Sequence, residues 1–200
     1  MAEQNSHPAD KSLASWAHVW AAAASQTYEV IESISMPDSP ASELGRRDAM
    51  TMVLVDAVQN VVRGAEKLLG RDSEAVRRFN EEHPNLKQLR DRFEHYEDYV
   101  RGTGFDQREG KKWTGTPLTL ETTGLRVTAS EGGGPEGHIV HLVAIERGPD
   151  GDPVEISYKA PSRDIAVAVR TLARDLLEEA SMLDEHHTSR CEMCADPSAI

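Results

Sequence analysis

The spacing of apolar residues changes twice along this 200-residue chain. Over residues 13–34 and again over residues 50–68 they recur every three or four positions, which predicts two long helices. Asp10 or Ser12 is the expected N-cap of the first helix, and Gly70 is a natural stop for the second. The proline-containing segment 36–40 separates the two helices.

Two shorter helices are expected next. Asp72 or Ser73 caps the first of them, and the run His83-Pro84-Asn85 starts the second, which extends through residues 86–100 and ends at Gly102. After Gly102 the pattern becomes short and rich in β-branched residues. Four strands are predicted, at residues 118–122, 125–130, 138–146 and 154–158, and glycine-containing turns separate them.

Helical spacing returns from Pro161-Ser162 to Leu183. The order of helices, strands and a final helix predicts an α+β protein that is predominantly α. We expect a disordered start over residues 1–10 and one domain over residues 11–187. A small antiparallel β-meander is inserted at about 116–159, before the last long helix, and residues 188–200 form a flexible tail that contains both cysteines.

The net charge and the apolar stretches argue against several classes of protein. The formal net charge is −12, which argues against a DNA-binding protein, although residues 71–112 hold ten basic and ten acidic side chains and are neutral. The most apolar stretch, residues 16–24, carries His18 and is too short to span a membrane. The N-terminus has no secretory pattern, so we expect a cytoplasmic protein.

Arg90 and His95 are separated by four residues, and Asp91 directly follows the arginine. Together with the preceding long helices, this Arg-x4-His pattern resembles the HEPN superfamily, whose fold is an up-and-down helical bundle. The resemblance covers the helical parts of the chain and not the meander. It implies a metal-independent endoribonuclease of a phage-defence or toxin system that works as a homodimer on RNA.

The chemistry of such a site suits these residue types. Arginine can hold a phosphate with two parallel hydrogen bonds, and histidine can move protons near neutral pH. On the resemblance, Arg90 holds phosphate, His95 is the acid/base, and Asp91 orients one of them. In a continuous helix His95 would lie about 140° from the apolar stripe and therefore point outward.

Arg90 and His95 would also lie about 140° apart around that helix and about 7.5 Å apart along it, so a site shared by two subunits is expected. The alternative is a non-catalytic HEPN-like dimerisation or protein-interaction module. In that case Arg90 pairs with Glu94 or Glu97 on its own helix.

The two cysteines, Cys191 and Cys194, form a Cys-x2-Cys pattern shortly after His187. These three residues predict part of a structural zinc site, which needs four nitrogen or sulfur ligands. A fourth ligand is not apparent nearby. The candidates are His186, His83, His138, His141 or a residue of a dimer mate. A redox pair of thiols and a tail without metal are the alternatives.

Overall fold

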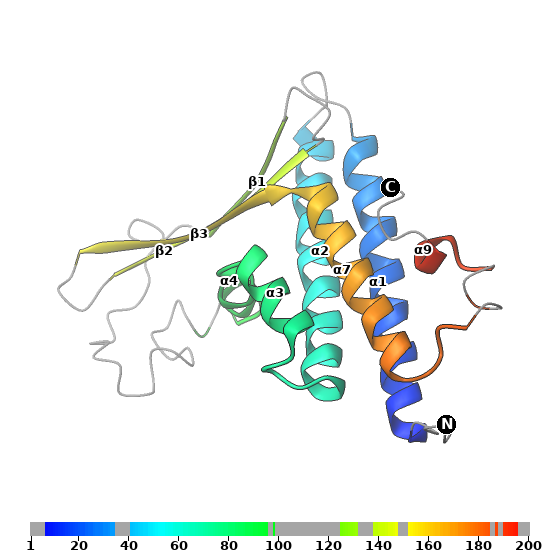
Figure 1. Ribbon diagram of the computed structural model, residues 1–200. Helices are drawn as coiled ribbons and strands as arrows, with labels where there is room; N and C mark the ends of the chain where they lie inside the picture. The colour runs from blue at the N-terminus through cyan, green and yellow to red at the C-terminus, as the bar shows by residue number, and fades with distance from the viewer. Residues whose placement is uncertain are drawn as a thin grey trace.

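The computed structural model describes residues 7–34, 41–95, 98, 125–131, 138–147, 152–184, 187 and 190–195. The fold is α+β and predominantly helical, as the sequence predicted. Helices α1 (Pro8–Ser33), α2 (Ala41–Leu68) and α7 (Ser162–Glu179) lie side by side and pack against one another, as Figure 1 shows. The predicted strand at 118–122 and the break at 36–40 lie outside the described residues.

Small side chains allow α1 and α2 to approach closely. Ala14, Ala17, Ala21 and Ala24 repeat at helical spacing along α1, and all four are fully buried. Across from them on α2, a Cβ atom added to Gly64 would lie 3.0 Å from the Ala17 Cβ. The close approach of the two helices therefore favours a glycine at position 64, because a side chain there would require Ala17 to shift by a few tenths of an ångström.

The helix ends follow local chemistry. α1 begins earlier than predicted, because Pro8 occupies its first turn and the Nδ1 atom of His7 accepts a hydrogen bond from the Ala9 N–H at 3.2 Å. Gly70, just beyond α2, has a φ of 91°, in the left-handed region that favours glycine. The Ser73 hydroxyl caps α3 (Glu74–Glu82) by accepting from the Val76 N–H.

Helix α4 (Leu86–Glu94) is shorter than predicted. The sequence pattern suggested that it runs to Gly102, but it ends at Glu94, and His95 is its C-cap with φ −113° and ψ 33°. Its residues Leu86 and Leu89 are buried in the core. The expectation that Arg90 and His95 share one continuous helix is therefore wrong, because the backbone leaves helical geometry at His95.

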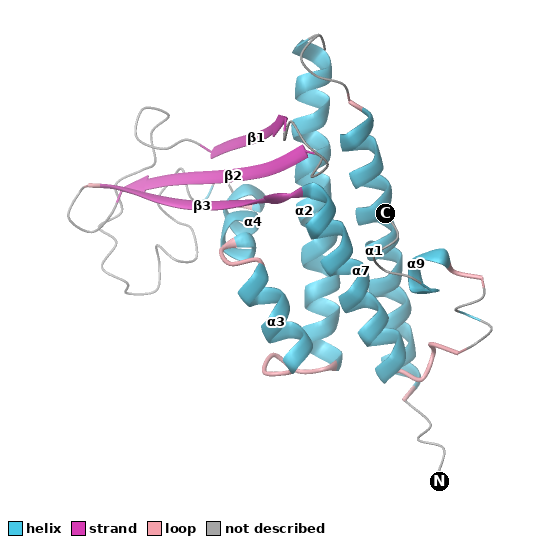
Figure 2. Cartoon of the chain, turned by 45° about the horizontal axis from the view of Figure 1, so that its top comes forward, coloured by secondary structure: helices cyan, strands magenta, loops and turns pink. Residues whose placement is uncertain are grey.

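The β-meander is confirmed. Strands β1 (Leu125–Glu131), β2 (His138–Arg147) and β3 (Pro153–Pro161) form one antiparallel sheet in the order β1-β2-β3, and β3 leads directly into α7. Figure 2 shows the sheet extending away from the long helices beyond α4. The buried residues Val140, Leu142 and Tyr158 connect the sheet to the helical core.

A carboxylate fastens the start of β2 to the start of α7. Glu32 at the end of α1 accepts hydrogen bonds from the His138 N–H at 3.0 Å and from the Ser162 hydroxyl at 2.5 Å. Its second oxygen lies 3.0 Å from Nδ1 of His138. Burial alone would raise the pKa of Glu32, but these bonds from Ser162 and His138 lower it, so the carboxylate stays charged.

Near the end of the chain, the short helix α9 (Glu192–Ala195) packs beside α1, on the side of the long helices away from α3 and α4 (Figure 1). Cys194 is only 2% exposed and belongs to the main core. Residues 190–195 therefore pack as part of the domain instead of forming the flexible tail that was expected. None of the helices in the described part of the chain is both long and apolar enough to cross a membrane.

Candidate functional site

Helix α4 buries Arg90 against α2. Arg90 is 5% exposed, and its guanidinium lies among three carboxylates. Nη2 and Nε donate to one oxygen of Asp56 at 2.8 and 3.2 Å, and Nη1 donates to Asp91 at 3.4 Å and pairs with Glu94. The second oxygen of Asp56 accepts from Asn60 at 3.5 Å. All the nitrogen atoms of the guanidinium are therefore engaged within the chain.

These carboxylates keep Arg90 charged despite its burial. Burial by itself would lower the pKa of Arg90, but the hydrogen bonds that it donates to Asp56 and the charge of Glu94 raise it above its usual value. Arg63 approaches Glu94 as well, with 3.9 Å between Nη2 and Oε2. Because the cluster holds three carboxylates and two guanidinium groups, its formal net charge is negative.

His95 has a different environment. Its side chain is 56% exposed, and Nε2 lies 3.7 Å from the Glu94 oxygen that also pairs with Arg90. The prediction that His95 points outward is confirmed. Arg90, which the resemblance gives the role of holding phosphate, does not face solvent beside His95, because its guanidinium turns inward to the carboxylate of Asp56.

The structure thus brings Arg90, Asp91 and His95 to one place, with Glu94 between the arginine and the histidine. The Arg90–Glu94 pair of the alternative interpretation is present, whereas Glu97 lies outside the described residues. The sequence analysis missed Asp56. No local signal marks it, since it is one acidic residue on a predicted helix far away in sequence.

A second cluster joins the two ends of the chain. One side-chain atom from each of His18, His187, Cys191 and Cys194 lies within 4.8 Å of the others, and this group could hold a metal ion. His187, Cys191 and Cys194 are the three ligands expected from the sequence. The fourth residue, His18, comes from α1, more than 160 residues earlier in the chain.

Three distances within this cluster are close to those between the ligands of one small ion. Nε2 of His187 lies 3.2 Å from Sγ of Cys194. Sγ of Cys191 lies 3.7 Å from Nε2 of His18, and Sγ of Cys194 lies 3.7 Å from Nδ1 of the same ring. In a tetrahedral zinc site, bond lengths of about 2.3 Å to sulfur and about 2.0 Å to nitrogen place neighbouring ligand atoms about 3.5 Å apart. Either nitrogen of His18 is within reach.

Local backbone geometry positions these ligands. The Cys191 N–H donates to the carbonyl of His187 and the Cys194 N–H donates to the carbonyl of Cys191, each at 2.9 Å, so two consecutive turns point the three side chains toward α1. The two cysteines form no disulfide. Burial raises the pKa of the Cys194 thiol to about 12, with Cys191 adding to the shift, and burial also lowers the pKa of His18. Burial thus favours the neutral forms of Cys194 and His18.

The other histidines that were candidates for the fourth ligand lie elsewhere. His83 is hydrogen-bonded to Tyr158, His138 is hydrogen-bonded to Glu32, and His141 is on β2. His186 lies outside the described residues. A signal for His18 was present in the sequence, because it is a lone histidine inside the most apolar stretch of the chain.

No family model matches the chain, and no curated protein or solved structure shows significant similarity to it.

Proposed function

We propose that this protein is a non-catalytic interaction module built on a HEPN-like helical bundle, with a structural zinc ion that fastens its C-terminal segment to α1. In this proposal Arg90 and His95 do not cleave RNA. Arg90 anchors α4 to α2, and His95 is a surface residue beside the anchor.

The observation that carries the proposal is the environment of Arg90. An arginine that binds phosphate must present free N–H donors in a positive or neutral surrounding. Here the nitrogen atoms of Arg90 contact Asp56, Asp91 and Glu94, and the side chain is 6% exposed. A phosphate would have to displace these carboxylates while being repelled by them. If Arg90 instead anchors α4 to α2, its carboxylate partners stay where they are.

His95 alone does not support a ribonuclease. Its imidazole is exposed and contacts Glu94, so a nearby base exists. Phosphodiester cleavage also needs a cation directed at the charge that develops on the phosphate. The arginine nearest in sequence, Arg92, is buried and donates to the Gln88 carbonyl at 3.0 Å.

The test is RNA cleavage by the purified full chain in a buffer without added divalent metal and without a chelator, so that the proposed zinc ion stays bound. We expect the wild type and His95→Ala to leave a mixed RNA substrate equally intact. Cleavage by the wild type that is abolished in His95→Ala would establish the ribonuclease and end this proposal. His95→Ala purified in the same way is the control, because a contaminating nuclease would cleave the RNA in both samples.

Zinc is the proposed ion because the ligand set has two imidazoles and two thiols. Soft thiolates with imidazole select Zn²⁺ over Mg²⁺ or Ca²⁺, which prefer oxygen ligands. A set of four protein ligands also has no open position for substrate, which is typical of a structural site. The burial of Cys194 and its place in the core fit a site that stabilises the fold.

Metal analysis of protein purified without added metal tests this assignment. We expect about one zinc ion per chain, and we expect His18→Ala to lose it, while His95→Ala, which removes an exposed histidine outside the cluster, retains it. Co²⁺ substitution gives a second readout, since thiolate ligands produce an intense near-ultraviolet charge-transfer band. A metal-free protein that contains a Cys191–Cys194 disulfide would favour the redox alternative.

We also propose that the module is a homodimer, which rests on the resemblance of the helical part to HEPN proteins. Light scattering of the purified protein measures its mass in solution. The mass of a single chain, 22.0 kDa, would exclude this part of the proposal.

A further inference from the structure

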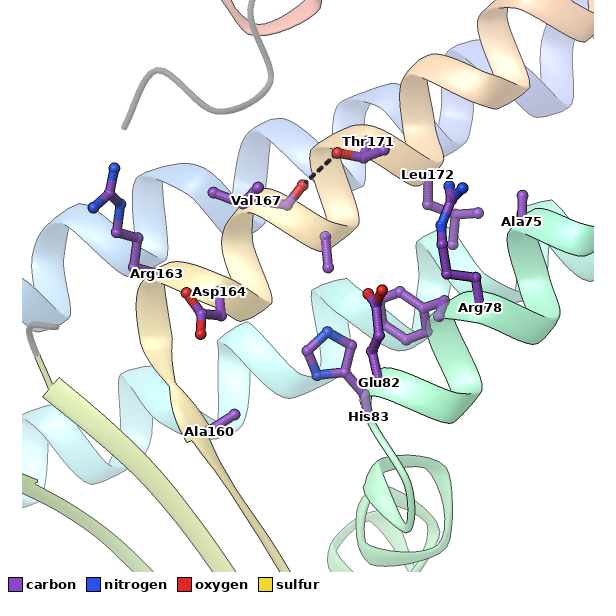
Figure 3. A pocket seen from close by; sticks show the side chains of 12 residues that line it. Ala75, Arg78, Glu82, His83, Ala160, Arg163, Asp164, Val167, Thr171 and Leu172 are labelled. Carbon is purple, nitrogen blue, oxygen red and sulfur yellow. Dashed lines mark hydrogen bonds between the residues drawn. The ribbon is translucent and has the colours of Figure 1, made fainter.

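A cavity of about 610 Å³ lies between α3, α7 and the end of β3, away from both clusters described above. This volume is within the range of small-molecule sites. Figure 3 shows its lining, with α7 along one side and α3 along the other. None of Arg90, His95 or the four metal-site residues lines it.

One wall of this cavity carries a buried histidine with one nitrogen unoccupied. His83 is 6% exposed, and its Nδ1 lies 2.8 Å from the hydroxyl of Tyr158. Tyr158 is itself buried, and its hydroxyl has no other hydrogen-bond partner in the described part of the chain, so we infer that it donates to Nδ1. The proton of the imidazole then lies on Nε2. No described residue accepts a hydrogen bond from Nε2.

The imidazole is neutral at physiological pH. Burial lowers the pKa of His83, although the carboxylates of Glu82 and Asp164 act in the opposite direction. His83 therefore presents a neutral N–H donor to the cavity and does not repel a cation.

Two carboxylates stand next to this imidazole. Glu82 and Asp164 line the cavity, and in the described part of the chain neither forms an ion pair or a hydrogen bond through its side chain. The basic residues of the lining do not neutralise them. Arg78 pairs with Asp175 at 3.2 Å, and Arg163 extends away from His83 in Figure 3.

The remaining wall is apolar. Phe79 and Leu172 are 4% and 2% exposed, and Val167 and Ala168 lie next to them along the lining. A ligand that fits this surface has a hydrophobic part of about the size of an aromatic ring.

We propose that this cavity binds a small organic amine that carries an oxygen acceptor next to the ammonium group and a hydrophobic side group. The ammonium group lies between Glu82 and Asp164, the oxygen accepts from Nε2 of His83, and the side group packs on Phe79 and Leu172. Amino alcohols and α-amino amides have this chemistry. The net charge of −12 favours the approach of a cationic ligand. This inference does not depend on the proposed function.

Three probe molecules separate the contributions of the ammonium group and the carbonyl oxygen to binding. Phenylalaninamide has the ammonium, the carbonyl and the aromatic ring, hydrocinnamamide lacks the ammonium, and phenethylamine lacks the carbonyl. Each is titrated into the ¹⁵N-labelled full chain, and amide chemical shifts are followed. We expect phenylalaninamide to bind with shifts that cluster on α3 and α7, phenethylamine to bind more weakly, and hydrocinnamamide to bind at least about tenfold more weakly than phenylalaninamide.

Variants with unchanged shape test the two carboxylates. Glu82→Gln and Asp164→Asn should each weaken phenylalaninamide at least about threefold, and the double variant at least about tenfold. Glu81→Gln is the matched control, since Glu81 is 71% exposed on the same helix, pairs with Arg77 and does not line the cavity. It should bind as the wild type does.

Several results would overturn the proposal. One is the absence of binding by phenylalaninamide up to about 10 mM. Others are equal binding of phenylalaninamide and hydrocinnamamide, or an equal effect of Glu81→Gln and Glu82→Gln. Glu82 and Asp164 are both exposed, so the conservative variants Glu82→Gln and Asp164→Asn should fold as the wild type does.

Discussion

Replacing Arg90 with methionine tests whether this arginine anchors α4 to α2 or has a catalytic role. Methionine keeps much of the length and apolar contact of the arginine stem but removes the charge. Asp56, Asp91 and Glu94 then lie close together without the guanidinium between them, although Arg63 still approaches Glu94, and the packing of α4 on α2 is weakened.

The expected loss of stability depends on how deeply Arg90 and its carboxylate partners are buried. Breaking a buried ion pair by removing one partner costs about 3–5 kcal/mol. Here the arginine side chain is 6% exposed, but Asp56, Asp91 and Glu94 are 47%, 40% and 41% exposed, so water can solvate them in the variant. We therefore expect a decrease of about 2–3 kcal/mol in the free energy of unfolding. For a chain of this size that corresponds to a melting temperature lower by about 4–12 °C.

His95→Ala is the matched control, because the side chain is 56% exposed and its loss should change the free energy of unfolding by less than about 0.5 kcal/mol. Thermal and urea unfolding followed by far-ultraviolet circular dichroism measure both variants. If Arg90→Met were as stable as His95→Ala, the anchor would not exist, and a role for Arg90 in binding or catalysis would again be the better explanation.

Three further predictions concern the metal centre, the helix interface and a buried histidine. A strong chelator should lower the melting temperature of the wild type but leave that of His18→Ala unchanged, and scanning calorimetry with and without the chelator measures both. Gly64→Val should lower the free energy of unfolding by about 1–3 kcal/mol in urea titrations, because its side chain would meet Ala17; an unchanged midpoint would show that α1 and α2 can separate without cost. Burial lowers the pKa of His83 below its usual 6.5, so the unfolded state takes up its proton first and stability should decrease as the pH falls below about 6.5. His83→Gln should reduce that slope in urea titrations at pH 7 and pH 5, and an unchanged slope would assign the effect to other groups.

Much of the fold was predictable because it depends on local patterns. The repeat of small and apolar residues specified α1 and α2, Ser73 specified the start of α3, and glycine-separated β-branched runs specified the meander. The end of α4 was not predictable in this way. Residues 95–100 keep a helical pattern in sequence, yet the backbone leaves the helix at His95.

The candidate sites show the same division. The sequence supplied His187, Cys191 and Cys194 because ligands close in sequence have recognisable spacing. In the sequence His18 stands out only as a lone histidine in the most apolar stretch, and it is the packing of the C-terminal segment on α1 that brings its imidazole to the sulfur atoms.

The amino-acid sequence by itself determined the order of helices and strands and three of the four residues of the metal cluster. Only the tertiary structure decided the role of Arg90, because Asp56 reaches it from another helix 34 residues away in sequence. A side chain's charge environment is set by what packs against it, and packing partners distant in sequence leave no periodic signal in a single chain.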